Sequence, residues 1–372
     1  MLKNLLSCAC NAQIGMSMKI VFVIPDMPGG GTERVVSLLA NEYSRRRIEV
    51  AILLFAGHET AYQLDDRIEV VSMGAPTEGR LGARIERIRK MRKYYKENRN
   101  CQIWSFSVMG AVFSVIAALG QKHYLLVSER SDPNQYEHPK IRDFFYGFAD
   151  VVVCQTKESM ESFPIRIVKK AVVLPNPVDI GTLEPCDGQR EKRVVAVGRI
   201  GPPKNHELLI RAFARFVEDF PEYTLELYGR GVQEAELREL AGRLGIGQKV
   251  IFCGFSERVQ EKINDAAMYV LSSDYEGVSN SLLEAIALGI PVIATDCPIG
   301  GCRTYVKDGI NGLLVPVGEI EPLAAAMKKI AGDSVFAGKL SLEGRKLREE
   351  IQVERIADRF LALQERKGKQ NG

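Results

Sequence analysis

Two glutamates lie eight positions apart in the segment SSDYEGVSNSLLEAIALGIPVIATD. Glu276 stands in a loop after an apolar run that is typical of a buried strand, and Glu284 stands inside a helix expected to begin near Ser279 or Asn280. A helix that begins at the carboxyl end of a strand directs its free backbone N–H groups and the positive end of its dipole beyond the strand. The segment therefore favours an anion-binding site with the two glutamates beside it.

Glu284 also has a purely structural interpretation. The spacing Ser281-x-x-Glu284 matches a capping box, and Gly289 before Pro291 is an ordinary helix stop. The residues leave both interpretations of Glu284 open. Glu276 has no such structural duty, since acidic loop residues at strand ends are free to meet ligands.

Two cations flank a turn in the segment VAVGRIGPPKNHELLI, between a buried strand and a helix. Arg199 offers a planar fork of donors and Lys204 a point charge, and both suit a diphosphate. The alternative is that both are solvated turn residues. The segment is not a Walker loop, because the G-x-x-x-x-G-K spacing is absent.

A glycine-rich turn, PDMPGGGTERVV, follows the first strand. Gly30 and Gly31 permit a tight turn and a close approach of the backbone to phosphate or sugar. The G-x-G-x-x-G fingerprint of dinucleotide-binding proteins is not met, which disfavours a dehydrogenase.

Apolar runs and helical patterns alternate from residue 18 onward. Continuous apolar strands separated by helices predict parallel sheets that are covered on both faces, and hence the α/β class. Strands are expected at 18–26, 48–56, 68–73, 102–107, 123–130, 150–156, 171–177, 193–200, 223–229, 249–255, 267–273, 291–297 and 312–317. Helices are expected at 33–47, 80–97, 108–119, 205–219, 233–244, 257–265 and 279–288.

The pattern restarts after a polar segment, LEPCDGQREKR, that reads as a linker. It predicts two Rossmann-like domains that face each other, with a ligand in the cleft at the carboxyl ends of their strands. The expected parts are a disordered or spurious extension (1–17), an N-terminal acceptor-side domain (18–182), the linker (183–193), a C-terminal nucleotide-sugar-binding domain (194–352), and a C-terminal helix and tail (353–372).

The composition excludes several classes of protein. The 372 residues are 46% hydrophobic, enough for two ordinary cores, and 50 Lys and Arg balance 47 Asp and Glu, which argues against a nucleic-acid binder. No run of about 18 apolar residues predicts a transmembrane helix. Cysteines inside apolar runs, such as Cys154 and Cys253, are typical of buried free thiols in a cytoplasmic protein. Neither cysteines nor histidines show metal-ligand spacing.

Taken together, these motifs resemble a retaining family-4 glycosyltransferase with the GT-B fold. The resemblance spans residues 18–365 and is carried by E-x7-E, the Arg199/Lys204 turn, the glycine-rich loop, the segment LPNPVD, and the segments EGVSNSLLEA and VSERSDP. It implies transfer of a hexose or N-acetylhexosamine from a UDP-sugar to a glycan or lipid-linked saccharide in the synthesis of a cell-surface polysaccharide such as lipopolysaccharide or capsule. No cofactor and no metal are expected.

The resemblance also implies roles for individual residues. Arg199 and Lys204 would hold the diphosphate, Glu284 the ribose hydroxyls, and Glu276 the transferred sugar. The backbone at Val278, Ser279, Asn280, Gly30 and Gly31 would complete the cradle, and the uracil would lie near Gly229, Gly254 and Phe255. The acceptor-side candidates are Glu33, Arg34, Glu129 and Arg130.

Two departures from the family pattern affect this assignment. Many relatives carry a histidine where this chain has Ser128-Glu129-Arg130, and many carry a glutamate where GGCRTYV offers Arg303 and Thr304. The first bears on the sugar contacts and the second on donor affinity. The alternatives are a nucleotide-sugar epimerase of the same fold, or a non-catalytic glycan-binding subunit.

The segment from Arg80 to Arg99 is strongly basic, with nine cations against Glu86 and Glu97. A solvated surface helix is one interpretation. The other is peripheral contact with anionic lipid at the inner face of the membrane, which would bring the site to a lipid-linked acceptor.

Overall fold

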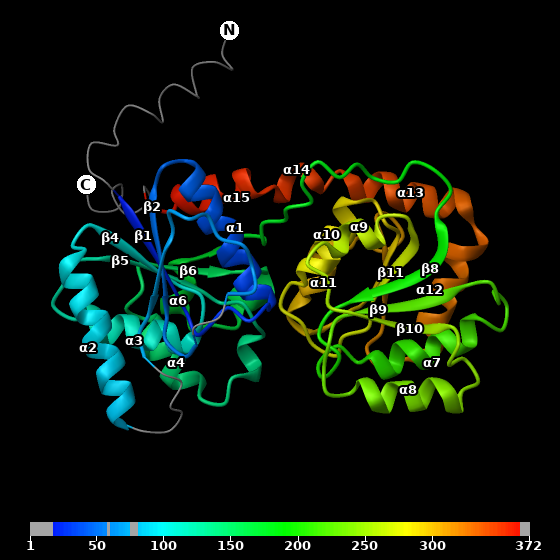
Figure 1. The fold of residues 1–372 in the computed structure, drawn as a ribbon, viewed down its shortest axis with the longest axis horizontal. Helices are drawn as coiled ribbons and strands as arrows, with labels where there is room; N and C mark the ends of the chain where they lie inside the picture. The colour runs from blue at the N-terminus through cyan, green and yellow to red at the C-terminus, as the bar shows by residue number, and fades with distance from the viewer. Residues whose placement is uncertain (1–17, 58–59, 75–80, 365–372) are drawn as a thin grey trace, which may run out of the picture.

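The computed structural model describes residues 18–57, 60–74 and 81–364. They form two parallel β-sheets, each flanked by helices, that lie side by side along the long axis of the molecule (Figure 1). This is the predicted α/β architecture of two Rossmann-like units. The expectation for residues 1–17 lies outside the described residues.

The N-terminal sheet has seven parallel strands in the order β3-β2-β1-β4-β5-β6-β7. Its elements are β1 (Lys19–Ile24), α1 (Gly31–Arg45), β2 (Glu49–Leu54), β3 (Glu69–Ser72), α2 (Leu81–Glu97), β4 (Cys101–Ser105), α3 (Val108–Ala118), β5 (Tyr124–Ser128), a 3-10 turn (Pro133–Gln135), α4 (Pro139–Tyr146), β6 (Val151–Cys154), α5 (Lys157–Glu161), α6 (Ile165–Val168) and β7 (Ala171–Val173). The predicted strands are all present. Helices α4, α5 and α6 were not predicted.

The C-terminal sheet has six parallel strands in the order β10-β9-β8-β11-β12-β13. Its elements are β8 (Glu191–Val197), α7 (His206–Phe216), β9 (Thr224–Tyr228), α8 (Glu234–Arg243), β10 (Val250–Gly254), α9 (Val259–Ile263), β11 (Ala266–Leu271), α10 (Asn280–Ala287), β12 (Val292–Thr295), a 3-10 turn (Pro298–Gly300), α11 (Gly301–Tyr305), β13 (Leu313–Val315), α12 (Ile320–Gly332) and α13 (Ser334–Arg345). Helices α14 (Arg348–Ile351) and α15 (Val353–Leu361) follow.

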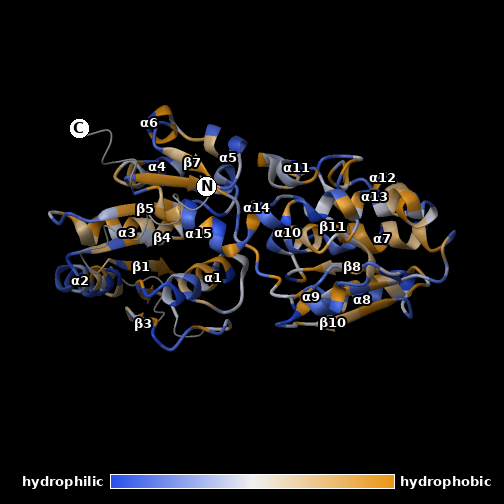
Figure 2. Cartoon of the chain, turned by 90° about the horizontal axis from the view of Figure 1, so that it is seen from above, coloured by the Kyte–Doolittle hydropathy of each residue, from blue (hydrophilic) through white to orange (hydrophobic). Residues whose placement is uncertain are grey.

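Each sheet has two apolar faces, and this explains why the strands read as continuous apolar runs. In β1, Phe22 belongs to the cluster on one face, and its neighbours Val21 and Val23 belong to the cluster on the other. In β11, Val270 and Leu271 divide in the same way. Successive side chains of a strand point to opposite faces, so every position must be apolar when both faces are covered. Figure 2 shows the apolar strands between the helical layers.

The chain crosses between the domains twice, and the two crossings touch. Val178, after β7, donates its backbone N–H to the carbonyl of Ile351 at the end of α14 (2.8 Å). Helix α15 then packs on the N-terminal domain, where the ring of Phe360 stacks on Trp104 with centroids 5.6 Å apart. The last helix of the chain thus completes the core of the first domain, and this contact has no local sequence signal.

Two local expectations need correction. Strand β8 begins at Glu191, inside the segment expected to be a linker, because Glu191 pairs with Ala266 of β11. Cys253 is exposed rather than buried, since β10 is the edge strand of its sheet and lacks a neighbour on one side. Cys154 is a buried free thiol, as predicted.

Candidate active site

The candidate residues lie where the strand order reverses in each sheet. From β1 the N-terminal sheet runs outward through β2 in one direction and β4 in the other, and β8 holds the same place in the C-terminal sheet. Loops that leave neighbouring strands in opposite directions open a crevice at this point, where α/β proteins bind their ligands. The glycine-rich loop follows β1, the Arg199/Lys204 turn follows β8, and Glu276 follows β11.

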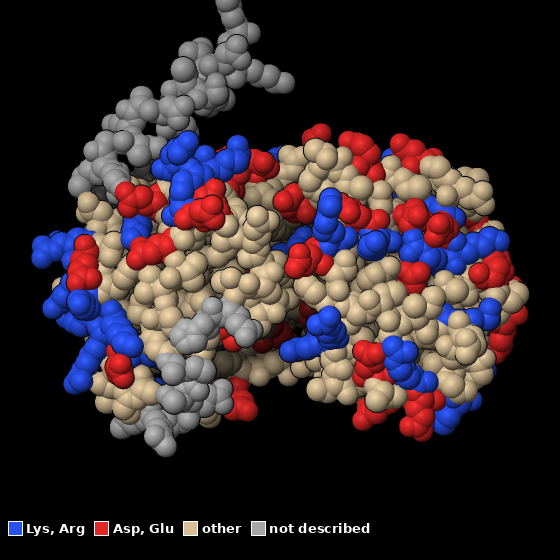
Figure 3. Space-filling model, viewed as in Figure 1, with Lys and Arg blue, Asp and Glu red and all other residues tan. Residues whose placement is uncertain are grey.

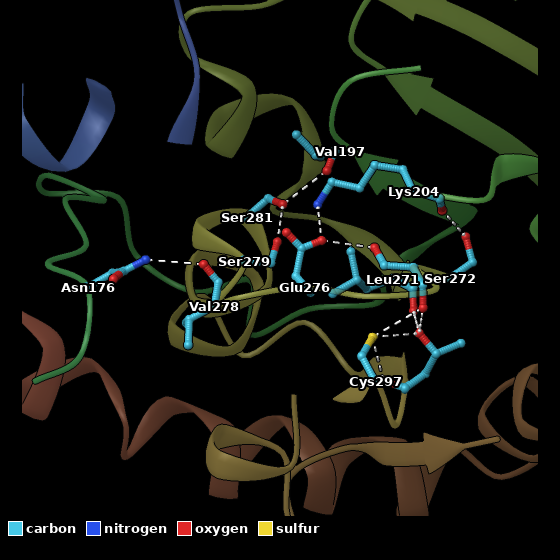
Figure 4. Close-up of polar contacts among 12 residues, drawn as sticks. Asn176, Val197, Lys204, Leu271, Ser272, Glu276, Val278, Ser279, Ser281 and Cys297 are labelled. Atoms are coloured by element: carbon cyan, nitrogen blue, oxygen red, sulfur yellow. Dashed lines mark hydrogen bonds and ion pairs between the residues drawn. The ribbon is translucent and has the colours of Figure 1, made fainter. Parts of the chain in front are cut away.

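Lys204 and Glu276 form an ion pair in this crevice (Figure 4). Lys204 Nζ lies 2.9 Å from Glu276 Oε2, which also accepts a hydrogen bond from the hydroxyl of Ser273 (3.0 Å). Ser272 donates to the backbone carbonyl of Lys204 and holds the turn in place (2.9 Å). Both charged side chains keep contact with solvent, with exposed fractions of 15% and 17%. A ligand can therefore reach the cation and the carboxylate together.

Arg199 lies across the crevice from the glycine-rich loop. Its side chain is exposed, yet it is close enough to Glu33 of α1 to lower the pKa of that carboxyl. Burial has the larger effect, and together with the charge of Asp26 it leaves the pKa of Glu33 raised. The N-terminal end of α1 and the Arg199/Lys204 turn thus share one electrostatic environment, although they belong to different domains.

Glu284 belongs to α10 and is buried, with 4% of its side chain exposed. Its Oε1 lies 2.8 Å from Nε of Arg34, which reaches over from α1. The N-cap of α10 is Ser279, which makes no side-chain capping bond, and Ser281 donates instead to the carbonyl of Val197 (3.0 Å). The capping-box interpretation of Glu284 is therefore wrong, because the carboxylate pairs with another domain and not with its own helix.

Residues that start α10 are bonded to the N-terminal domain. Asn280 donates its amide to the carbonyl of Gly31 (2.8 Å), and the backbone N–H of Val278 donates to the side chain of Gln155 (3.3 Å). Asn176 donates to the carbonyl of Val278 (3.2 Å) and to the side chain of Asn280 (2.5 Å). Only the first of these contacts joins residues that the sequence had singled out.

Gln155 and Asn176 are the site residues that sequence reasoning did not identify. Gln155 directly follows β6, and Asn176 lies in the LPNPVD segment after β7. Both are buried, with 3% and 2% exposed. A buried amide at the carboxyl end of an apolar strand needs a hydrogen-bond partner. A polar residue at the end of an apolar run was therefore the sequence signal that could have identified these two positions.

Gly229 and Gly254 lie together at the ends of β9 and β10. The backbone N–H of Gly229 donates to the carbonyl of Gly254 (2.8 Å). A Cβ atom at position 229 would lie 1.9 Å from the carbonyl oxygen of Gly198, so only glycine permits this approach. Phe255 directly follows Gly254 and is 45% exposed, which leaves an apolar aromatic side chain at the surface beside the two glycines.

The two candidates in the loop after β5 have different surroundings. Glu129 is 3% exposed, and its carboxylate accepts hydrogen bonds from the hydroxyl of Tyr146 (2.9 Å) and from the backbone of the next two residues. The carboxylate of Glu129 therefore does not face the crevice. Its hydrogen bonds stabilise the loop after β5. Arg130 donates to Asn176 (2.5 Å) and lies over the ring of Phe106, and burial lowers its pKa to about 10.

The remaining polar groups near the crevice carry no metal signature. Within the described part of the chain, there is no group of three or more His, Cys, Asp and Glu side chains arranged to hold a metal ion. Arg303 stands at the second departure from the family pattern. Its Nε lies 2.6 Å from Oδ1 of Asp296. His206 begins α7 and is buried, and burial next to Lys204 lowers its pKa to about 4.

Helix α2 carries the basic segment at one end of the molecule, where Figure 3 shows Lys and Arg gathered on the surface. Two of its cations turn inward: Arg87 is buried, and Arg92 donates to the carbonyls of Ala117 (3.0 Å) and Leu119 (2.6 Å) at the end of α3. The exposed cations of α2 are Arg84, Arg89, Lys90, Lys93 and Lys96, and the exposed Arg99 follows the helix. Among the described helices, none has the length and apolar character that a membrane crossing requires.

Comparison with known proteins identifies relatives of both halves. Residues 187–347 match the family described as glycosyl transferases group 1. Over 93% of the chain, the sequence is 28% identical to a Campylobacter jejuni protein and covers 98% of it; this relative is named GalNAc-alpha-(1->4)-GalNAc-alpha-(1->3)-diNAcBac-PP-undecaprenol alpha-1,4-N-acetyl-D-galactosaminyltransferase.

Two solved structures share the fold. Anabaena Alr3699/HepE, in complex with UDP and glucose, superposes with a TM-score of 0.80 at 21% identity, over 93% of this chain and 98% of that one. The apo form of the lipopolysaccharide outer core galactosyltransferase WaaB has a TM-score of 0.72 at 22% identity, over 94% of this chain and 100% of that one. At these identities the structural likeness shows the architecture alone.

Proposed function

Because this chain is a GT-B glycosyltransferase whose C-terminal half is a group 1 glycosyl transferase domain, we propose that it transfers a hexose or N-acetylhexosamine from a UDP-sugar. The acceptor is a hydroxyl of a glycan or lipid-linked saccharide in cell-surface polysaccharide synthesis. The observation that carries the proposal is the largely buried but solvent-accessible Lys204–Glu276 pair in the crevice between the domains. The C. jejuni relative is named for transfer to an undecaprenol-linked saccharide, and Alr3699/HepE contains UDP.

The donor is proposed to lie along the carboxyl ends of β8 to β11. Arg199, Lys204 and the N-terminus of α10 suit its diphosphate, because cations and helix N–H groups stabilise that charge. The carboxylate of Glu284 suits the ribose hydroxyls, and that of Glu276 the transferred sugar. The exposed ring of Phe255 and the glycine turns beside it suit the flat uracil.

Incubation with a panel of UDP-, GDP- and ADP-sugars tests the proposal. UDP-sugars are expected to raise the melting temperature, since a ligand that binds the native state stabilises it. UDP release is expected to depend on a lipid-linked saccharide acceptor. Stabilisation by GDP- or ADP-sugars alone, or release of UDP with an altered free sugar and no acceptor, would contradict it.

Transfer is expected to need no added metal and to retain the anomeric configuration. The leaving diphosphate gains charge as the glycosidic bond breaks, and fixed cations with a helix N-terminus can stabilise that charge. Front-face attack, with the leaving phosphate taking the acceptor proton, would give retention. Turnover in EDTA should equal turnover in magnesium, and NMR coupling constants should report an unchanged anomer. Loss of activity in EDTA that magnesium restores, or an inverted product, would refute the prediction.

Peripheral contact of α2 with anionic lipid is proposed to bring the crevice to a lipid-linked acceptor. The exposed cations of α2 face solvent, and helix α4, which packs on α3 beside it, exposes Phe144 (56%). Cations next to an anionic surface and apolar side chains that enter its boundary together favour such contact. The proposed location is the inner face of the cytoplasmic membrane.

Vesicle sedimentation tests the membrane contact. The double variant Lys93→Gln/Lys96→Gln should bind anionic vesicles about thirtyfold more weakly, since each cation near such a surface contributes about 1 kcal/mol. The matched variant Arg238→Gln/Arg243→Gln removes two exposed cations of α8 in the other domain and should bind like the wild type. Vesicle binding that depends neither on anionic lipid nor on salt would contradict the proposed membrane contact.

A further inference from the structure

The buried carboxylate of Glu284 has its charge partner in the other domain. Arg34 extends from α1 so that its Nε lies 2.8 Å from Glu284 Oε1, and its guanidinium also lies 5.9 Å from the ring centroid of Tyr62. Only 19% of the Arg34 side chain and 4% of the Glu284 side chain are exposed. The nucleotide side of the crevice therefore includes a cation that the C-terminal domain does not supply.

Two buried hydrogen-bond donors lie next to this carboxylate. Nε of Arg34 lies 2.8 Å from Glu284 Oε1, and Nε2 of Gln260, on α9, is buried beside the same carboxylate. Gln260 faces Glu284 from its own domain. The cluster thus combines a carboxylate acceptor with two donors, and it suits a ligand that brings hydroxyl groups, which both donate and accept.

The charge of Glu284 depends on groups from several elements. Burial raises the pKa of its carboxyl, Arg34 from α1 lowers it, and Asp179 from the segment after β7 raises it. Gln260 of α9 also lowers it. Two phenols, Tyr62 before β3 and Tyr269 in β11, lie near enough for the charge of Glu284 to contribute to their raised pKa, which burial mainly causes. Among these groups, Arg34 is the cation that opposes the effect of burial.

We propose that Arg34 is a positioning residue for nucleotide recognition: it holds Glu284 charged and oriented toward the ribose hydroxyls. The inference rests on the proposed function, because it takes a UDP-sugar as the donor. It goes further in assigning part of the nucleotide site to the N-terminal domain.

The sharpest probe is the difference in affinity between UDP and 2′-deoxy-UDP. Both have the same diphosphate, so titration of the phosphate cancels in the ratio of their dissociation constants. Wild type is expected to prefer UDP about tenfold, as suits one hydrogen bond to a charged group. In Arg34→Met, that preference should weaken as the pH falls while the wild type keeps it, because burial favours the neutral form of the unpaired carboxyl. Isothermal titration calorimetry measures both constants.

Three further variants separate positioning from a structural effect. Arg34→Lys restores the cation and should recover the preference for UDP. Glu284→Gln should lose the preference at every pH, and adding Arg34→Met to it should change nothing more, since Arg34 acts through the carboxylate. Arg45→Met removes a cation of the same helix that is 64% exposed and pairs with Glu42, and should behave as wild type.

The outcomes are distinguishable from those of the proposed function. Failure of the wild type to bind UDP would contradict the proposed function itself. The role of Arg34 would be contradicted if the wild type binds UDP and the Arg34→Met variant keeps the full preference for UDP over 2′-deoxy-UDP across the pH range. Tighter binding of UDP by Arg34→Met would overturn it as well, since Arg34 would then compete with the ribose. Melting curves confirm that each variant is folded.

Discussion

Replacing Lys204 with alanine is expected to lower kcat by about a hundredfold to a thousandfold, the effect of removing one preorganised charge donor. Lys204 is held by its backbone contact with Ser272 and lies 2.9 Å from Glu276 in the crevice. Its contact with the diphosphate should strengthen as negative charge develops on the leaving group. For this reason kcat should fall by more than KM rises. Steady-state kinetics with the donor varied at saturating acceptor measures both constants.

A matched variant makes the Lys204 result specific. Lys192 stands in the same domain, at the start of β8, and pairs with Glu222 on the surface. Lys192→Ala removes an equal charge far from the crevice and should leave both constants unchanged. An increase in KM with an unchanged kcat in Lys204→Ala would show that Lys204 binds ground state and transition state equally.

Glu284→Ala is expected to weaken UDP binding by about 1.5 to 3 kcal/mol, the contribution of a buried hydrogen bond to a charged group. Glu276→Ala should spare UDP binding and reduce transfer, because Glu276 is proposed to contact the sugar and its removal frees Lys204 for the diphosphate. Calorimetry with UDP and turnover with the intact donor separate the two effects.

The control for both glutamates is Glu207→Ala, since Glu207 is an exposed carboxylate in the first turn of α7. It should alter neither UDP affinity nor turnover. Glu284→Ala also leaves Arg34 unpaired in a largely buried position, so its melting temperature should fall. If the melting temperature falls and UDP binds normally, Glu284 serves only as the partner of Arg34 and not as a ligand group.

The sequence by itself determined the architecture, and it predicted where the candidate site lies. Parallel strands covered on both faces must be continuously apolar, so their positions could be read from local composition. Glu276, Arg199 and Lys204 stand in loops at the carboxyl ends of such strands, and in an α/β sheet those loops necessarily meet at one edge.

Only the tertiary structure decided which groups are partners across the crevice. Arg34 and Glu284 are 250 positions apart, and nothing local distinguishes Glu284 as an ion-pair partner from Glu284 as a capping residue. The same holds for Gln155 with Val278, and for α15, which fills the core of the first domain. Periodicity reports how a residue sits within its own element. The partner of a buried charge depends on how the two domains pack, and that arrangement is set by contacts remote in sequence.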